Sequence, residues 1–492
     1  SYSKIFHEKH QLYAGFDYSI AQKKNHFYTF IVEGFPDGKL DFIGNALQYE
    51  KNGVPKGTEE LSRRVGFTGN VNYIYNNRYF MDLSFRVDGS SLFGTKNKFA
   101  PFWSAGIGWN VHNEKFMQNQ NIVNNLRIRG SYGETGSQQF SSYQALSTFQ
   151  SYTGKRYIIW NGSELMGLGN EKLKWQVTKQ LNGGVEVGLF DGRLSASFDI
   201  YSKKTSNLLS QMDLPLANGF SSYVDNVGEV KNTGYEAMIS GYLMRDTHRN
   251  IIWSMTAKLA YTKNEITKLS EAIKRQNELY KSKNVEINQL LYEGYAQNSI
   301  WAVPSMGIDP STGYEIFLDK NGNITDKWNP SDKRYFGVDE PKYRGNISTY
   351  FAWKDLSVNL SFAYQWGGQQ YNETLLNKVE VTNGEIDKNN VDSRVLKKRW
   401  QYIGDVKPYK GYGSVETKAT SRFVMDDNVF QFQSASVEYR LHSDFLRDKW
   451  KVETISIGAN MSDIFYISSI KRERGTSYPF ARRLALTLSL MF

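Results

Sequence analysis

The stretch Leu484-Ala-Leu-Thr-Leu-Ser-Leu-Met-Phe492 closes the 492-residue chain and decides how the rest is interpreted. Its leucines alternate with small or polar residues, so an extended strand here has one apolar face and one mostly polar face. A soluble sheet rarely leaves so apolar a strand at its edge, whereas a transmembrane β-barrel strand faces lipid on one side and the lumen on the other. The pattern predicts a barrel strand if the remaining chain repeats it.

The composition agrees with an all-β protein. The chain has 32 Tyr, 29 Phe and 41 Gly but only 10 Pro, which suits strands and tight turns. It has no Cys and its six His are scattered, so we expect no disulfide framework, no metal site and no cofactor. The net charge of +10 is spread along the chain, which argues against a nucleic-acid partner.

Alternating segments recur along the whole chain, about fifteen in all. Asn76-Asn77 and Asp191-Gly192 are typical two-residue hairpin turns between such segments. The expected strands lie near 10–20, 27–34, 62–75, 81–88, 99–111, 126–132, 181–190, 194–200, 232–243, 253–261, 342–353, 355–366, 429–440, 452–461 and 483–492.

Short connections alternate with long ones after residue 20, as in outer-membrane barrels with short periplasmic turns and long extracellular loops. The longest loop should contain a helix from Lys268 to Lys283 and a small hairpin at Tyr314–Leu318. If the C-terminus is periplasmic, the extracellular loops are 35–60, 89–98, 134–179, 204–230, 262–340, 367–428 and 462–482.

Several sequence blocks, in the same order, resemble the SusC/RagA-type TonB-dependent transporters. They cover nearly the whole chain. The blocks are Arg86-Val-Asp-Gly-Ser-Ser-Leu-Phe-Gly94, Phe99-Ala-Pro-Phe-Trp-Ser-Ala-Gly-Ile-Gly-Trp109, Leu126-Arg-Ile-Arg-Gly-Ser-Tyr-Gly-Glu-Thr-Gly136, Asn226-Val-Gly-Glu-Val-Lys-Asn-Thr-Gly-Tyr-Glu236 and Gly475-Thr-Ser-Tyr-Pro-Phe-Ala-Arg-Arg483.

The resemblance implies an outer-membrane barrel of about 22 strands that is closed by an N-terminal plug. Residues 1–492 would form the C-terminal part of this one transmembrane domain, without plug or signal peptide, as a cleaved, split or partial chain. It further implies import of oligosaccharides or oligopeptides across the outer membrane of a diderm bacterium. The implied partners are a SusD-like surface lipoprotein, the missing barrel and plug portion, TonB acting through the plug, and outer-membrane lipid and lipopolysaccharide.

Aromatic residues in the expected loops are candidates for ligand binding, because their rings can stack on sugars or hold apolar peptide side chains. Packing within the loops or contact with a partner protein is the alternative for each. The candidates are Tyr157, Trp160, Phe220, Tyr223 and Trp301.

Other residues have structural interpretations. Arg127 and Arg129 share the polar face of one strand and should meet the lumen or plug, where they can pair with carboxylates. Phe492 is typical of the terminal assembly signal of outer-membrane barrels. Asp319–Asn323 is similar to a calcium loop but fits a hairpin turn better.

The basic runs Lys397–Arg399 and Lys471–Arg474 are expected to be solvated loop charge, or to pair with lipopolysaccharide phosphates. No catalytic motif is visible, so an enzyme is not expected. A structural or assembly role in a multiprotein membrane complex stays open as the alternative to transport.

Overall fold

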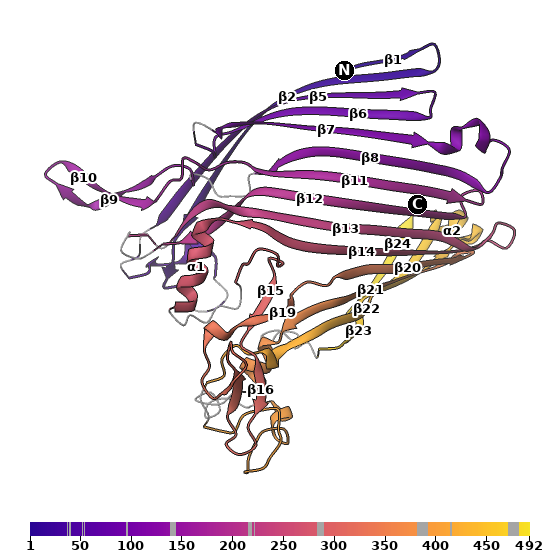
Figure 1. Cartoon of the computed structure of the whole chain (residues 1–492). Coiled ribbons are helices and arrows are strands. Elements are labelled where there is room, and N and C mark those ends of the chain that lie inside the picture. The colour runs from indigo at the N-terminus through magenta and orange to yellow at the C-terminus, as the bar shows by residue number, and fades with distance from the viewer. Residues whose placement is uncertain are drawn as a thin grey trace.

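A single antiparallel sheet of 15 strands forms most of the molecule (Figure 1). The computed structural model describes residues 1–36, 38, 41–51, 53, 55–94, 97–137, 144–214, 219–220, 222–282, 290–380, 392–413, 416–470 and 482–492. Each strand of the sheet pairs with its predecessor along the chain. The sheet strands are β1 (Tyr2–Phe6), β2 (His10–Thr29), β5 (Lys56–Tyr75), β6 (Tyr79–Ser90), β7 (Phe99–Asn110), β8 (Val123–Ser137), β11 (Gln176–Leu189), β12 (Leu194–Asp213), β13 (Ser222–Asp246), β14 (Ile251–Leu269), β20 (Tyr343–Trp353), β21 (Leu356–Tyr371), β22 (Val424–Leu441), β23 (Thr454–Ser468) and β24 (Arg483–Met491).

The separation expected between a strand at 10–20 and a second strand at 27–34 is wrong. Residues 10–29 form one strand, β2, which pairs with β5 without interruption from His10 to Thr29. The first sheet strand is instead β1, which the sequence did not reveal. Its turn to β2 places His7 and Glu8 at φ 48° and 56°, a conformation usually signalled by Gly or Asn.

The expected loop 204–230 is also wrong, because most of it is strand. β12 continues to Asp213 and β13 begins at Ser222. The apolar alternation fades there, while the backbone pairing of the two strands continues with two register shifts. The expected alternation of connection lengths fails once, because residues 111–122 between β7 and β8 form a longer connection than residues 91–98 between β6 and β7. The four longest connections, 30–55, 138–175, 270–342 and 372–423, all lie at the same end of the sheet, which defines a long-loop end and a short-turn end.

The two faces of the sheet differ in polarity. The outer face carries Leu484, Leu486, Leu488 and Leu490, and the side chain of Leu486 is 77% exposed. The register places further exposed apolar side chains on the same face of other strands, among them Phe16, Ile107, Ile200, Ile239 and Ile457. A water-facing sheet does not expose so continuous an apolar surface, so this face fits a lipid environment.

Two rows of aromatic rings border this apolar surface. Tyr235, Tyr261, Tyr343 and Trp366 are cross-strand neighbours toward the long-loop end, with ring centroids 5.1 to 5.2 Å apart. Tyr75, Tyr79 and Trp109 form a stacked row at the short-turn end, with ring centroids 6.5 and 6.4 Å apart. Aromatic girdles of this kind mark the two interfaces of a membrane.

The distance between the two interfaces can be followed along β20. Tyr343 and Trp353 are the first and last residues of this 11-residue strand and face outward. Their separation is about 33 Å along a strand, which gives a height of about 25 Å at the usual tilt of about 40° and equals the apolar band of a transmembrane barrel.

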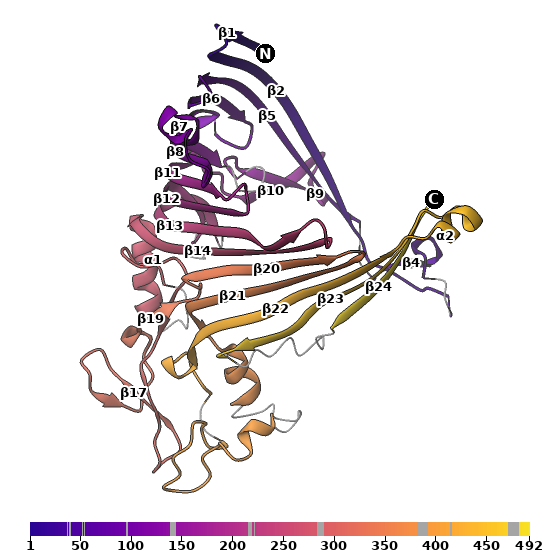
Figure 2. The same ribbon diagram turned by 90° about the vertical axis from the view of Figure 1, so that its right-hand side faces the viewer.

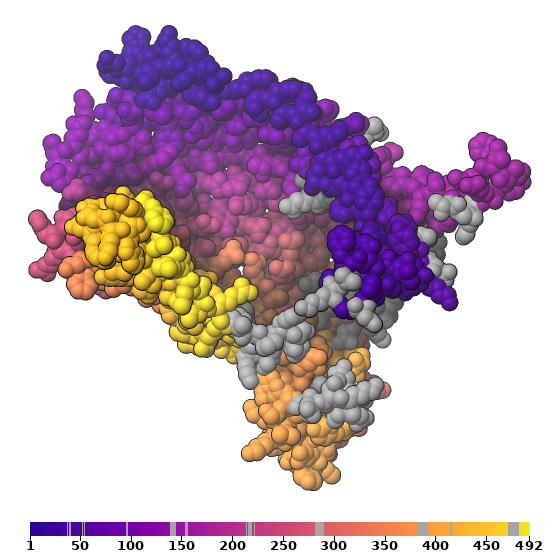
Figure 3. Space-filling view, turned by 180° about the vertical axis from the view of Figure 1, so that it is seen from behind, coloured from indigo at the N-terminus to yellow at the C-terminus, as the bar shows by residue number. Residues whose placement is uncertain are grey.

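The sheet is strongly curved, and β1 and β24 are its two edges (Figure 2). Seen from behind, the surface is hollowed between the N-terminal and C-terminal strands (Figure 3). Within the described ranges, no helix has the length and hydrophobicity that crossing a membrane requires.

The long-loop end carries small elements of its own. The helix α1 (Glu271–Ser282) is confirmed within the predicted range. A short helix, α2 (Asp444–Trp450), lies at the short-turn end. The remaining strands, which pair outside the main sheet, are β3 (Val32–Glu33), β4 (Gln48–Tyr49), β9 (Thr148–Tyr157), β10 (Trp160–Gly167), β15 (Ser299–Ala302), β16 (Ser305–Ile308), β17 (Glu315–Leu318), β18 (Ile324–Thr325) and β19 (Arg334–Val338).

Candidate functional site

The inner face of the sheet, opposite the apolar one, carries a charged row that crosses three strands. Arg129 on β8, Gly184 on β11 and Asp199 on β12 are aligned by the strand register. The Nη2 of Arg129 donates to Oδ1 of Asp199 at 2.6 Å, and its Nε lies 3.4 Å from Oε1 of Glu186. Gly184 makes this contact possible, because a Cβ atom there would lie 2.2 Å from the Asp199 carboxylate.

Arg127 lies on the same inner face, two residues from Arg129 along β8 in the direction of the short-turn end. Its guanidinium lies over the ring of Phe80, 4.1 Å from the centroid. Its Nε is buried and has no hydrogen-bond partner among the described residues. A cation–π contact holds this side chain in place, and a further acceptor could still satisfy the nitrogen.

The five aromatic candidates do not gather into one site. Tyr157 and Trp160 face each other across the β9–β10 turn, and the Trp160 side chain is 71% exposed. This hairpin projects from the long-loop end (Figure 1). Tyr223 packs on β13 against an apolar cluster that includes Met212, and Phe220 is partly buried nearby.

Trp301 has a different environment from the hairpin pair. Only 9% of it is exposed, and its ring contacts Tyr292, Tyr295 and Tyr335 at centroid distances of 4.6, 5.0 and 6.0 Å. A ligand could stack on this ring only if the surrounding tyrosine rings moved apart. The ligand-binding role of Trp301 stays a prediction that requires this movement.

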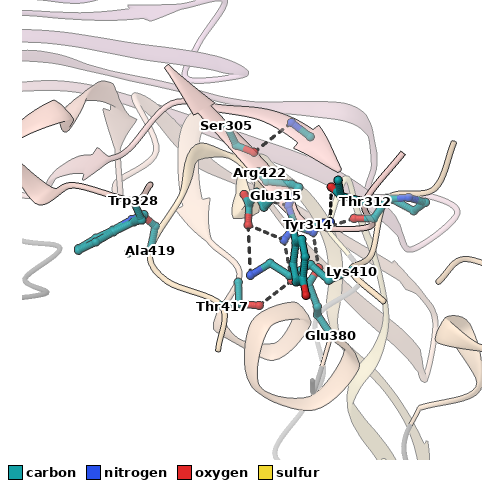
Figure 4. A network of polar contacts seen from close by, with 12 residues as sticks. Ser305, Thr312, Tyr314, Glu315, Trp328, Glu380, Lys410, Thr417, Ala419 and Arg422 are labelled. Carbon is teal, nitrogen blue, oxygen red and sulfur yellow. Dashed lines mark hydrogen bonds and ion pairs between the residues drawn. The ribbon is translucent and has the colours of Figure 1, made fainter. Parts of the chain in front are cut away.

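The loops after β14 and β21 build an external lobe around a buried ionic network (Figure 4). Arg422 donates through Nε and Nη2 to Glu315 on β17 at 3.2 and 3.0 Å. It also donates through Nη1 and Nη2 to Glu380, which receives a further bond from Thr417. Only 1% of Glu380 is exposed. The network therefore fixes segments that are 42 and 107 residues apart in the chain.

Burial affects the pKa values of the basic side chains in this lobe. Burial lowers the pKa of Lys410, although its Nζ lies 3.8 Å from Glu315. Burial would also lower the pKa of Arg422, but the hydrogen bonds to Glu380 and Glu315 outweigh it and raise that pKa. Arg422 therefore stays charged as the centre of the lobe, and the arrangement is a structural clasp that holds distant segments together.

The structure corrects one expectation about loop charge. Arg399 was expected in solvent, but only 1% of it is exposed; it donates to the Lys410 carbonyl at 2.9 Å and lies over the Tyr412 ring. Burial lowers its pKa. The second basic run, Lys471–Arg474, lies outside the described residues.

The hairpin interpretation of Asp319–Asn323 is confirmed. The turn connects β17 to β18, and Oδ1 of Asp319 accepts the backbone N–H of Asn321 and of Asn323, both at 2.8 Å. Hydrogen bonds from Asn323 lower the pKa of Asp319. Over the part of the chain that the structure describes, no group of three or more His, Cys, Asp or Glu is placed to hold a metal ion.

Comparison with known proteins identifies this architecture. Residues 2–460 match the family model described as TonB dependent receptor-like, beta-barrel, and the chain belongs to this family of outer-membrane proteins. The TonB-dependent receptor P3 of Formosa agariphila is 29% identical over 91% of this chain and 45% of its own length. The TonB-dependent receptor SusC of Bacteroides thetaiotaomicron is 25% identical over 77% of this chain and 38% of its own.

The fold has solved counterparts. A structure of the RagAB peptide transporter superposes with a TM-score of 0.83 at 22% identity, covering 96% of this chain and 51% of the other. The expected resemblance and fold class are thereby confirmed, with the long-loop end extracellular. The chain spans about half the length of the relatives it matches.

Proposed function

We propose that this chain forms barrel wall and extracellular loops of a TonB-dependent importer for oligopeptides or oligosaccharides. The observation that carries the proposal is the inner face, a charged and hydroxyl-rich wall behind an apolar outer face that fits a membrane. Such a wall can contact a polar oligomer in transit. The continuous sheet from β1 to β24 supports residues 1–492 as part of one barrel domain.

We infer the partners from the family. An N-terminal barrel and plug portion would contact Arg127 and Arg129 on the inner face, and TonB would act through that plug. A SusD-like lipoprotein would dock on the extracellular side, where the external lobe lies. Lipid and lipopolysaccharide would meet the outer face and its aromatic rows. One solved relative is described as a peptide transporter, which favours oligopeptides as the first substrate class to test.

The test is uptake by living cells. In-frame removal of this chain should abolish accumulation of one pool of labelled oligopeptides or oligosaccharides, and removal of TonB should have the same effect. Mass spectrometry of the complex purified from the native membrane should find a plug-bearing partner and a surface lipoprotein. Unchanged uptake with an intact complex would instead support a structural or assembly role.

A further inference from the structure

A cavity on the inner face lies apart from the Arg129 row. Its volume is about 750 Å³, within the range of small-molecule sites, and it lies toward the extracellular ends of β2, β5, β6, β7 and β8. The lining includes Ser19, Arg64, Arg86, Asp88 and Ser104. A wall of this composition can bind a charged, hydrogen-bonding ligand.

Two of the charged groups in this cavity neutralise each other. The Nε of Arg86 donates to both carboxylate oxygens of Asp88 at 2.8 and 2.7 Å, and its Nη1 lies 3.3 Å from Oγ1 of Thr68. The pair lies against the bare backbone of Gly66, where a Cβ would come 2.9 Å from Arg86 and 3.0 Å from Asp88. Glu134, which also lines the cavity, pairs with Lys179 at 3.1 Å.

Arg64 is different. Its register partners are Ala21 on β2 and Ser90 on β6, which are both uncharged. Within the described residues, neither a hydrogen bond nor an ion pair engages its exposed guanidinium. Arg64 therefore gives the cavity a guanidinium that no ion pair among the described residues neutralises. Two positions further along β5, Gly66 pairs with Ser19, which places the Ser19 hydroxyl on the neighbouring strand of the same wall.

We propose that this cavity binds a carboxylate group of the transported oligomer. Arg64 would form the charge-assisted contact, because a guanidinium matches the two oxygens of a carboxylate, and the Ser19 hydroxyl on the neighbouring strand would donate a further hydrogen bond. The carboxylate could belong to a peptide or to an acidic sugar, since both present the same planar group. The inference rests on the proposed import function and adds a charge requirement to it.

The chain offers a matched control. Arg63 precedes Arg64 on β5, so its side chain lies on the other face of the sheet, where its Nε donates to Gln22 at 3.0 Å. Arg64→Gln and Arg63→Gln remove the same charge from the same strand. Only the first should affect a ligand in the cavity.

Binding is measured on the complete complex purified from the outer membrane. The probes are a mixed peptide pool, the same pool after methyl esterification, an oligouronate pool, and its carboxyl-reduced counterpart. We expect the wild type to retain ligands from one acid pool more tightly than from the neutralised pool. Arg64→Gln should weaken that binding about tenfold or more, and Arg63→Gln should leave it unchanged.

Equal binding of the acid and neutralised pools by the wild type would overturn the proposal. So would equal affinities of the two variants, or a loss in Arg64→Gln that is the same for neutral ligands, which would place Arg64 against the plug. Cell uptake is measured in parallel. Uptake that depends on this chain but not on ligand charge would support the import function and contradict the carboxylate site.

Discussion

Arg129 and Asp199 form an ion pair across an intervening strand, with Nη2 and Oδ1 2.6 Å apart. Gly184 of that intervening strand lies directly between them. The contact thus connects β8 to β12 on the inner face in addition to the backbone ladder, and it depends on a position without a side chain.

Gly184→Ala should therefore destabilise the barrel. The added Cβ would meet the Asp199 carboxylate at 2.2 Å and displace the ion pair, at a cost of about 1–3 kcal/mol. The loss should appear as a lower temperature for the heat-induced mobility shift in gel electrophoresis. Gly183→Ala is the control, because its Cβ would meet Ile200 at an ordinary 3.6 Å. Equal temperatures for the two variants would contradict the spacing argument.

Arg422→Met should loosen the external lobe. The substitution leaves Glu315 and Glu380 buried without their main cation, which costs about 3–5 kcal/mol of local stability. Hydrogen exchange should become faster in β17 and in residues 421–423. Arg447→Met removes an exposed pair with Asp444 and should cost less than about 1 kcal/mol. Unchanged protection in the Arg422 variant would show that the clasp is dispensable.

The lobe should also lose stability in acid through Asp319. Its folded-state pKa is lowered by hydrogen bonds, first from Asn323, below the unfolded value of about 3.9. Its stabilising contribution is therefore complete above that value and disappears as pH falls through the lowered pKa. Proteolysis of the hairpin between about pH 5 and pH 2 should show a smaller pH dependence in Asp319→Asn than in the wild type.

Deletion of Phe492 should reduce the amount of protein inserted in the outer membrane. The residue follows β24 and its side chain is 78% exposed, so its removal costs little buried contact within the chain. Quantification of the folded barrel in membrane fractions measures the effect. Phe492→Tyr keeps the aromatic terminus and should insert normally. Normal insertion after deletion would exclude the assembly-signal role.

The sequence predicted those parts of the fold that local pattern controls. Lipid on one side imposes the alternation of β24, and hairpin turns require particular residues, as at Asn76 and Asn77, whose φ values are 51° and 55°. Where β12 and β13 extend beyond the lipid, no solvent difference imposes that alternation, so the pattern could not show how far the strands continue.

The candidate sites were harder to predict, because they depend on contacts between distant residues. Arg422 and Glu315 are 107 positions apart, and nothing local marks either one as buried. Arg64 was not singled out either; its only local sign is the Arg63-Arg64 doublet, which places one cation on each face of a strand. By contrast, the placement of Arg127 and Arg129 on one face followed directly from the alternation.

The length of β14 has a consequence for any lipid-anchored partner. Tyr261 lies in the extracellular aromatic row, and the strand continues from there to Leu269, where the chain enters the lobe. That extension carries Leu269 about 20 Å above the aromatic row if the strand keeps its usual rise and tilt. A lipoprotein that docks on the lobe at the level of Leu269 while its acyl chains stay in the outer leaflet would need a tether of at least about six extended residues.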